Sequence, residues 1–485
     1  ICRRPSLSIG VFQLESDGLR QILRELKPDR FDDIVALVAL YRPGPLGSGM
    51  VEDYIKRRHG QIPLEYLHPI LEPILEPTYG VILYQEQVMR IAQDMGGLDL
   101  SEADQLRRAM GKKKREVLAA YRQAFEEGAA ARGVDPRIAA KVFELMEYFS
   151  GYGFNKSHSV AYALVAYQTA WLKAHYPVEF MAALLSSVME TKDKVPFYID
   201  ECRLRGIKIL GPDVNDSCAD FSVKDGAIRF GLAAIRQVGG PAIQAIIEER
   251  GKNGPYTSLE SFCRRVDLTQ VNRRVLENLI WAGAFKSVPG HYAQLLEILP
   301  LAVDQAMAWQ KEDDNQISLF DLNPQMKPTA DTLSLPDKEP VDQRNVLMKE
   351  KEVMGLYLSG HPLTPYSQLL RERISHRIDA LEGEDQQVIV GGIIGGLRRT
   401  VTKRGQMMAS FRLEDLTGSV DVLVFPKLFP TLSPFLENDL VILVRGRYQG
   451  QEDQPKLFLE KMEILNPKDG PGEEQGMDYP QGWIG

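Results

Sequence analysis

The chain has 485 residues and a formal net charge of −8 at pH 7, with 44% hydrophobic and 26% charged residues. This length exceeds what one hydrophobic core serves, so we expect about three or four domains in a soluble globular protein. The longest apolar run, within residues 34–41, is too short to cross a bilayer, and the sequence therefore excludes a membrane-spanning protein.

The cysteines are scattered, with no C-x-x-C pair and no nearby histidine at the spacing of metal ligands. We therefore expect no metal site, buried thiols and a reduced, cytoplasmic setting. The four are Cys2, Cys202, Cys218 and Cys263. The chain begins with Ile1 and lacks the charged-then-apolar layout of a signal peptide, so we interpret it as a piece of a longer protein.

Residues 10–205 follow a helical pattern, in which apolar residues recur about every 3.6 residues. Proline-rich breaks at 42–45 and 69–77 separate the predicted helices. These helices cover 31–41, 84–95, 117–131, 138–149 and 158–175. The pattern therefore predicts a helical domain over residues 1–206.

A cluster of cations occupies residues 107–115, where Arg-Arg-Ala-Met-Gly-Lys-Lys-Lys-Arg places six bases in nine positions. Ser101 and Asp104 form a predicted capping signal for the helix that carries Arg107 and Arg108. Arginine binds phosphate with bidentate geometry and lysine binds it as a point charge, so the cluster suits a triphosphate or a template backbone. The alternative is a solvated charged face.

Residues 151–159 read Gly-Tyr-Gly-Phe-Asn-Lys-Ser-His-Ser and run into a predicted helix that stops at Pro177. The glycines let the backbone turn, and the turn places Lys156, His158 and two serine hydroxyls beside the free N–H groups of the helix start. Such a start is an anion-binding site. The alternative is an ordinary capped turn with a solvated lysine and histidine.

Residues 207–310 begin with a strand-like, glycine-punctuated stretch and continue as short helices. Residues 231–246 resemble a helix-hairpin-helix, whose hairpin amides bind a DNA phosphate whatever the sequence. The predicted DNA contacts are Val238, Gly239 and Gly240, and a second copy is expected at 268–285. The glycines are adjacent and precede a proline, unlike the usual G-x-G spacing, so a purely structural helix pair is an equal alternative.

Residues 311–345 form a predicted acidic linker, with eight acids, four bases and few large apolar residues. The contrast with residues 107–115 shows that charge is segregated, which suits one phosphate-facing surface with acidic flanks. One apolar cluster, Gln-Ile-Ser-Leu-Phe, interrupts the linker. Apolar residues without a local core mark a docking peptide in such a segment, and the predicted contacts are Gln316, Ile317, Leu319 and Phe320.

Connecting helices are expected over 346–385, and the period of the apolar residues becomes two over 386–466. Five predicted strands in about 80 residues, with a helical piece at 426–436, indicate a small OB-type barrel. Such barrels bind single strands through a basic groove and stacking rings. The aromatic residues of this region include Phe411, Phe425, Tyr448 and Phe458, and we expect most of them in the core. The predicted DNA contacts are Arg398, Arg399, Lys403 and Arg404. The tail at 467–485 is glycine-rich, acidic and predicted to be disordered.

Several of these motifs resemble the fingers of bacterial family C replicative DNA polymerases, the family of the DNA polymerase III alpha subunits. The matching motifs are Gly-Val-Ile-Leu-Tyr-Gln-Glu-Gln-Val-Met at 80–89, Leu-Arg-Arg-Ala-Met-Gly-Lys-Lys at 106–113 and the stretch at 151–159. The resemblance implies that Arg107 and Arg108 face the triphosphate of an incoming dNTP, with Lys156 and His158 beside them. The expected DNA contacts of the basic cluster are Lys112, Lys113 and Lys114. Residues 84–87 are assigned to architecture alone.

The resemblance also implies partners. The peptide at 316–320 is similar to the one by which bacterial polymerases hold the sliding clamp, with Leu319 and Phe320 as hydrophobic anchors and Gln316 as the polar one. Ile317 stands where leucine is usual. The other implied partners are primer-template DNA, single-stranded template DNA and further replicase subunits, including the clamp loader.

The catalytic carboxylates of such a polymerase are missing from this sequence. Polymerase chemistry uses carboxylates that hold two Mg²⁺ ions, and the family carries them in a P-D-x-D-x-D motif. Asp213 and Asp216 follow Pro212 at the wrong spacing. The resemblance therefore implies that the phosphoesterase-like domain, palm and thumb precede Ile1 and that a C-terminal domain is also absent. We expect no catalytic residue in this chain and no polymerase activity from it alone.

The sequence as a whole predicts a multidomain protein, with mostly α-helical fingers and a helix-hairpin-helix region, followed by a small all-β OB-type barrel. We interpret it as the fingers-to-barrel part of a replicative polymerase that adds deoxynucleotides to a primer 3′ end. A non-catalytic, clamp-tethered DNA-binding protein would use the same features equally well. An OB-containing RNA-binding enzyme would explain the barrel but not the docking peptide.

Overall fold

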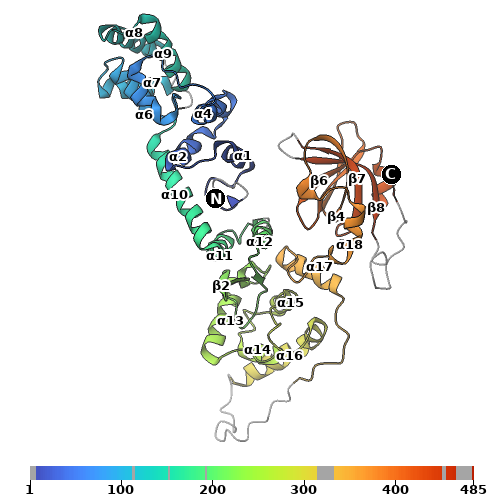
Figure 1. Ribbon diagram of the computed structural model, residues 1–485. Coiled ribbons are helices and arrows are strands. Elements are labelled where there is room, and N and C mark those ends of the chain that lie inside the picture. The colour runs from blue at the N-terminus through green and yellow to red at the C-terminus, as the bar shows by residue number, and fades with distance from the viewer. Residues whose placement is uncertain are drawn as a thin grey trace. The chain divides into compact units, whose positions relative to one another are not determined.

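The computed structural model describes residues 7–111, 115–150, 153–191, 194–313, 333–450, 455–465 and 483–484, with the backbone alone at 115, 116, 150 and 311–313. Figure 1 labels the helices and strands. The chain divides into two compact units. Unit 1 comprises Ile1–Leu210 with Phe221–Arg229, and unit 2 comprises Gly211–Asp220 with Phe230–Gly485. Within the described ranges, no helix is both long and apolar enough to cross a membrane.

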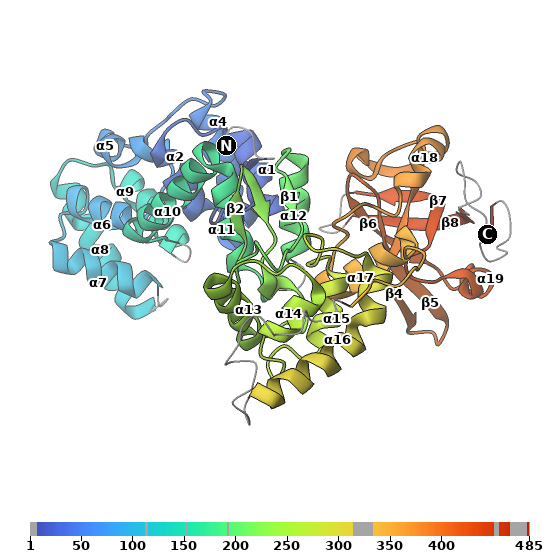
Figure 2. The ribbon, with the colours of Figure 1, turned by 90° about the horizontal axis from the view of Figure 1, so that it is seen from below.

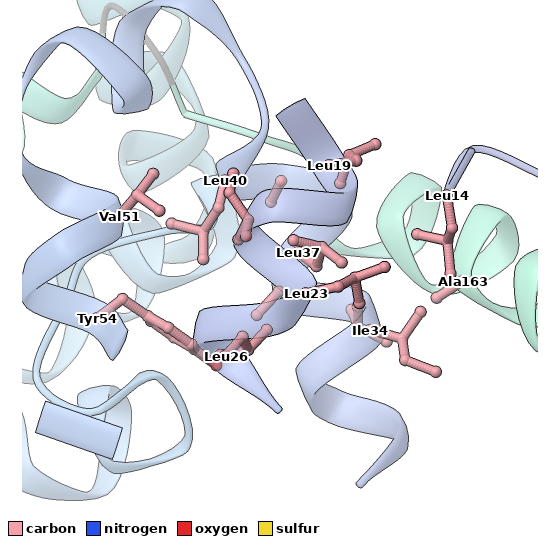
Figure 3. Close-up of a cluster of buried hydrophobic side chains, with 14 of the residues drawn as sticks. Leu14, Leu19, Leu23, Leu26, Ile34, Leu37, Leu40, Val51, Tyr54 and Ala163 are labelled. Carbon is pink, nitrogen blue, oxygen red and sulfur yellow. The ribbon is translucent and has the colours of Figure 1, made fainter. Parts of the chain in front are cut away.

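One hydrophobic core of unit 1 is shared by four helices, α1 (Asp17–Leu26), α2 (Phe31–Leu40), α4 (Met50–Arg58) and α10 (Lys156–His175). The short helix α3 (Pro43–Gly47) connects α2 to α4 in sequence. Helix α2 is apolar on almost all sides and is nearly entirely buried, as a helix in the middle of a core must be. Helix α10 meets it with the small residues Ala163, Ala166 and Ala170, which allow close approach. Figure 3 shows Leu23 beside Leu37 in this core and Leu14 beside Ala163.

The second core of unit 1 lies among five further helices, α5 (Glu72–Leu75), α6 (Gln85–Asp94), α7 (Leu100–Gly111), α8 (Arg115–Ala131) and α9 (Pro136–Ser150). Phe125 and Phe143 meet in it, with ring centroids 5.5 Å apart. The turn after α6 approaches α8 so closely that a Cβ at Gly128 would lie 1.8 Å from the carbonyl oxygen of Gly96. Only glycine fits at position 128.

Unit 1 ends in two helices and a small sheet. Helices α11 (Pro177–Ser187) and α12 (Lys194–Leu204) precede strands β1 (Ile209–Leu210), β2 (Ser222–Lys224) and β3 (Ala227–Arg229). The sheet has the order β1-β3-β2, with β1 parallel and β2 antiparallel to β3. The strand-like stretch predicted after residue 207 therefore forms three short strands.

A buried ion pair ties α10 to α12. Lys173 Nζ lies 3.0 Å from Glu201 Oε1, and both side chains are buried. Lys173 also donates to the carbonyl of Ile9, and Glu201 pairs with Arg205. Burial lowers the pKa of Lys173, and the Glu201 carboxylate opposes that effect. The end of the long helix is thus held by charge as well as by packing.

Unit 2 starts with a helical region made of the 3-10 turn η4 (Leu232–Ala234) and helices α13 (Gly240–Asn253), α14 (Leu259–Arg265), α15 (Arg273–Trp281) and α16 (Tyr292–Asp313). Helices α14 and α16 lie side by side (Figure 2). Helix α16 runs to Asp313, so its last residues fall inside the segment predicted to be a linker. Helices α17 (Gln343–Met354) and α18 (Ser367–Arg373) lead on toward the barrel.

The last part of unit 2 is a closed five-stranded barrel with the order β4-β5-β6-β8-β7. Its strands are β4 (Glu384–Val401), β5 (Met407–Glu414), β6 (Ser419–Val424), β7 (Val441–Gln449) and β8 (Lys456–Ile464). Strand β4 pairs with both β5 and β7, and its register shifts between Gly395 and Arg398. Helix α19 (Phe429–Leu432) lies between β6 and β7 in sequence, where a helical piece is predicted. The fold class predicted from the sequence is confirmed.

Asp33 forms a second buried charge cluster in unit 1. Its carboxylate accepts hydrogen bonds from Arg58 Nε at 3.0 Å and Nη2 at 2.7 Å, and from the amides of Asp29 and Arg30. Burial raises the pKa of Asp33, but the hydrogen bonds from Arg58 and from the two amides lower it overall. Because the folded-state pKa is the lower one, this stabilisation is full above about pH 4 and is lost as the pH falls through the folded-state pKa.

We predict that Asp33→Ala lowers the free energy of unfolding by about 3 kcal/mol, because it removes the buried partner of the Arg58 guanidinium. Arg58 then keeps only the half-exposed carboxylate of Asp29 and the carbonyl of Leu26. Between neutral and acid pH, the stability of the variant should also fall less than that of the wild type, because the variant has no Asp33 carboxylate to be protonated. Urea unfolding from neutral to acid pH measures both effects. Asp17→Ala is the control, because the carboxylate of Asp17 pairs with Arg20 but is 92% exposed. Equal losses for the two variants would contradict the role of the buried pair.

Candidate nucleotide-binding pocket and nucleic-acid interface

Helix α7 carries the arginine pair. Leu106 and Met110 are buried in the second core and fix the rotation of the helix. Arg107 and Arg108 therefore lie on the outer side, with 27% and 66% of their side chains exposed. The pair is held in place by the core but remains open to solvent.

The start of α7 is closed by a capping box that differs from the predicted one. Asp99 Oδ1 accepts from the amide of Glu102, and Glu102 Oε2 accepts from the amide of Asp99, both at 2.8 Å. The predicted cap of Ser101 and Asp104 is wrong, because both residues lie inside the helix. The D-x-x-E pattern at 99–102 carries the capping signal.

Asp104 binds both arginines instead. Its Oδ1 accepts from Arg107 Nε at 3.0 Å and from Nη2 at 2.7 Å, while its Oδ2 lies 2.8 Å from Arg108 Nε. The hydrogen bond from Arg107 and the charges of both arginines lower the pKa of Asp104. One ionised carboxylate therefore lies between two neighbouring guanidinium groups and orients them.

A cavity of about 240 Å³ opens beside this pair, lined by Gln85, Val88, Arg107, Arg108, Gly111, Phe149 and Gly153. Its lining comes from α6, α7, α9 and the loop before α10. Among the described residues, this lining contains two arginines and no acid. The cavity is therefore suited to an anion.

The N-terminus of α10 already carries a carboxylate of the same chain. Both oxygens of Glu86 lie 3.0 Å from the amide nitrogen of Lys156, and Asn155 Oδ1 accepts from the amide of His158 at 2.9 Å. The anion site predicted from the sequence at this helix start is thus partly filled by side chains. Ser159 is fully buried and out of reach of an external ligand, whereas Lys156 and His158 are exposed.

A row of rings continues from the pocket loop along α10. His158 lies between Phe154 and Tyr162, at centroid distances of 5.3 Å and 4.2 Å. Tyr162 in turn contacts Phe12 at 5.4 Å, and the Arg42 guanidinium lies 3.8 Å from the centroid of Phe154. Because His158 and Phe12 are exposed, the row offers a surface for stacking beside the arginine pocket.

The predicted hairpin of unit 2 has one turn in place of its first helix. Residues 232–234 form a single 3-10 turn, and Gln237 has a φ of 64°. Gly239 is the N-cap residue of α13, and both Gly239 and Gly240 are exposed. Val238 is buried, and its amide donates to the carbonyl of Ile235. In the second expected copy of the motif, at 268–285, helix α15 is capped by Asn272, which accepts from the amide of Val275.

The basic residues of the barrel lie at its first hairpin. Arg398 and Arg399 are exposed near the end of β4, and Arg399 Nη2 donates to the carbonyl of Leu436 at 2.9 Å. Lys403 and Arg404 are exposed in the turn that follows. The hairpin thus presents all four predicted contacts to solvent.

The barrel aromatics divide into core and surface. Phe411 and Tyr448 are core residues, as predicted. Phe425 is 45% exposed and stacks on Phe458 with centroids 5.4 Å apart. Phe425 directly follows the end of β6, and Phe458 is half-buried, so the expected core position holds for Phe411 and Tyr448 but not for Phe425.

Several predicted contacts lie outside the described residues. They are Lys112, Lys113 and Lys114 of the basic cluster and Gln316, Ile317, Leu319 and Phe320 of the docking peptide. Of the residues that the structure describes, no group of three or more His, Cys, Asp or Glu could hold a metal ion. Asp213, which the sequence excluded as a metal ligand, instead accepts a partly buried hydrogen bond from Ser287 Oγ at 2.9 Å. The described residues therefore do not fit a catalytic Mg²⁺ site.

Comparison with known proteins places these features in one family. Residues 4–133 match the bacterial DNA polymerase III alpha subunit finger domain, residues 206–295 a helix-hairpin-helix motif, and residues 388–465 an OB-fold nucleic acid binding domain. The DNA polymerase III subunit alpha of Vibrio cholerae is 43% identical over 467 residues, and that of Escherichia coli K12 is 42% identical over 471 residues. The alignments cover 94% and 95% of this chain.

The chain belongs to the family of the DNA polymerase III alpha subunits. It spans about 40% of the length of the curated relatives it matches. The family recognised from the sequence motifs is thereby confirmed. The finger-domain match covers Arg107 and Arg108 but ends before Lys156 and His158.

Three residues that line the pocket or hold the residues around it were missed as site residues by the sequence. Gln85 and Glu86 were assigned to architecture, and Asp104 to a helix cap. The contact between Glu86 and Lys156 joins residues 70 positions apart. No local pattern reports such a contact. The Asp104 contacts could have been found, because acids and arginines three and four residues apart face each other on a helix.

We predict that Asp99→Ala destabilises the fold by about 1 kcal/mol, because it removes the N-cap of α7. Ser101→Ala should cost much less, since Ser101 lies inside the helix and its hydroxyl receives only a long hydrogen bond from Gln105. Chemical unfolding of the two variants checks the order. A larger loss of stability for Ser101→Ala than for Asp99→Ala would show that Ser101 caps the helix, as predicted from the sequence.

Proposed function

We propose that this chain is the fingers-to-barrel part of a replicative DNA-directed DNA polymerase, which adds deoxynucleotides to a primer 3′ end in the cytoplasm. The observation that carries the proposal is the arginine pocket. Its two guanidinium groups are oriented by Asp104 beside a cavity whose described lining has no acid. The identity of 42–43% to polymerase III alpha subunits supports the same reading.

In this proposal, Arg107 and Arg108 bind the triphosphate of the incoming dNTP. Charge-assisted hydrogen bonds from arginine to phosphate are short and strong, and two adjacent arginines can each engage a different phosphate oxygen. Lys156 adds a point charge at the start of α10, next to the row of rings formed by Phe154, His158 and Tyr162. His158 and Tyr162 supply a face against which a base can stack.

DNA binding is proposed for the basic cluster and for unit 2. Lys112, Lys113 and Lys114 would contact the DNA backbone, and Gly239 and Gly240 would offer amides to a phosphate of the primer-template duplex. Arg398, Arg399, Lys403 and Arg404, with the stacked Phe425 and Phe458, suit a single-stranded template. The helix-hairpin-helix and OB-fold matches support nucleic-acid binding by these regions.

The chemical step is proposed to need groups outside this chain. Two-metal phosphoryl transfer requires Mg²⁺ held by carboxylates, and the described residues offer no such cluster. We therefore expect this chain alone to lack polymerase activity. Its residues bind, orient and stack the substrates, and the remaining replicase subunits, including the clamp loader, are proposed partners.

We predict that Arg107→Ala and Arg108→Ala each weaken dNTP binding by roughly tenfold or more, because each removes a contact worth about 1.5–3 kcal/mol. The measurement is a titration of the chain with dTTP and Mg²⁺. Arg90→Ala is the matched control, since Arg90 pairs with Asp94 on the exposed side of α6. Weaker binding of primer-template DNA with unchanged dTTP affinity would instead assign the pair to the template path.

The peptide at 316–320 is proposed to bind the sliding clamp, with Leu319 and Phe320 as anchors. Replacing both by alanine should cost roughly 2 kcal/mol and reduce clamp affinity at least about tenfold, because a short peptide depends on a few buried side chains. Gln316→Ala should cost less. The measurement is a binding titration against a bacterial sliding clamp.

Leu322→Ala is the matched control for this test, because Leu322 lies in the same segment but outside the motif. Thermal melting is recorded in parallel and should not change. Equal clamp affinity of wild type and the double variant would reject the motif. A large fall in melting temperature would show that the anchors are core residues.

A further inference from the structure

Gln85 contacts both sides of the arginine pocket. Its Oε1 accepts from Arg107 Nη1 at 3.0 Å, and its Nε2 donates to the carbonyl of Gly153 at 2.9 Å. Its backbone amide donates to the carbonyl of Phe154 at 2.9 Å. One side chain at the start of α6 thus joins α7 to the loop that leads into α10.

These contacts use only part of the hydrogen-bonding capacity of Arg107. A guanidinium has five N–H donors. Nε and Nη2 donate to Asp104, and Nη1 donates to Gln85. Among the residues that the structure describes, one N–H on each terminal nitrogen therefore remains without a partner, and Arg107 lines the cavity. A side chain that is already ordered loses less entropy when it binds an anion.

The neighbouring Gln87 shows what a purely structural glutamine looks like in the same helix. Gln87 is buried, and its Oε1 accepts from the amides of Leu83 and Tyr84. Its Nε2 donates to the Ile74 carbonyl and to Thr78 Oγ1. None of these partners lines the cavity. Gln85 differs because its partners are Arg107, which is a candidate phosphate-binding residue, and the carbonyl of Gly153 in the loop that lines the cavity.

We propose that Gln85 is a positioning residue for triphosphate binding, which acts through Arg107. It holds the guanidinium with two N–H groups presented to the cavity and ties that guanidinium to the loop at Gly153. This inference rests on the proposed dNTP function of the pocket. It adds a residue that neither the sequence motifs nor the family resemblance assigned to substrate.

The test is a double-mutant cycle with Gln85→Met, which keeps the length of the side chain but removes both of its hydrogen bonds. Inorganic tripolyphosphate and dTTP with Mg²⁺ are titrated into wild type, Arg107→Ala and Arg108→Ala, each with and without Gln85→Met. Gln87→Met is the matched control on α6. All titrations are made well below the melting temperature of each variant. If Gln85→Met melts near the assay temperature, Gln85→Asn, which shortens the reach of the amide, replaces it under the same criteria.

We expect Gln85→Met to weaken the binding of both probes roughly fivefold in wild type and in Arg108→Ala, as the loss of one hydrogen bond to a charged group requires. In Arg107→Ala it should have no further effect, because the partner is already gone. Gln87→Met should lower the melting temperature more than Gln85→Met does and leave affinity unchanged.

Two outcomes would overturn the inference alone. Unchanged affinity in Gln85→Met, with the arginine variants impaired, would leave the pocket intact and remove Gln85 from it. An equal loss in the Arg107→Ala background would show that Gln85 acts on the fold and not through Arg107. If wild type binds neither probe, or if both arginine variants bind like wild type, the proposed nucleotide site fails, and the inference fails with it.

Discussion

Two adjacent guanidinium groups repel each other unless an anion lies between them, and Asp104 supplies that anion. Asp104 lies one turn before the arginines on α7, and its two carboxylate oxygens bind Arg107 and Arg108. The hydrogen bond from Arg107 and the two positive charges lower the pKa of Asp104, so the carboxylate stays ionised at neutral pH. The pair can therefore remain ordered on a half-open surface before any ligand arrives.

Contacts around the arginine pair also connect α6, α7 and the loop before α10. The buried side of α7 fixes where the arginines point, and the cap by Asp99 fixes where the helix begins. Gln85 then links Arg107 to the loop before α10, and Glu86 holds the first amide of that helix. A carboxylate at the α10 N-terminus also limits what can bind there. The pocket thus depends on Gln85, which the sequence assigned to architecture, as well as on the glycine loop that stands out in the sequence.

Much of the fold could be predicted because it depends on local patterns. The helical periodicity of residues 31–41 and 158–175 matches α2 and α10, and the alternation after residue 386 matches the barrel strands. The arginine pair was also visible, since its motif is contiguous. Contacts such as Gln85 with Gly153 join residues 68 positions apart, and no periodicity reports them. The cap of α7 was misplaced because Asp104 fits a capping pattern and an i,i+4 ion pair equally well, and only the structure separates the two.

The central claim is that the arginine pair binds the triphosphate of a dNTP. The most direct measurement is a crystal structure of the chain with a non-hydrolysable dNTP and Mg²⁺. The account predicts the phosphates against Arg107 and Arg108, with Gln85 still bound to Arg107 and Gly153. A triphosphate bound elsewhere on a well-ordered chain, with both arginines still paired only with Asp104, would contradict it.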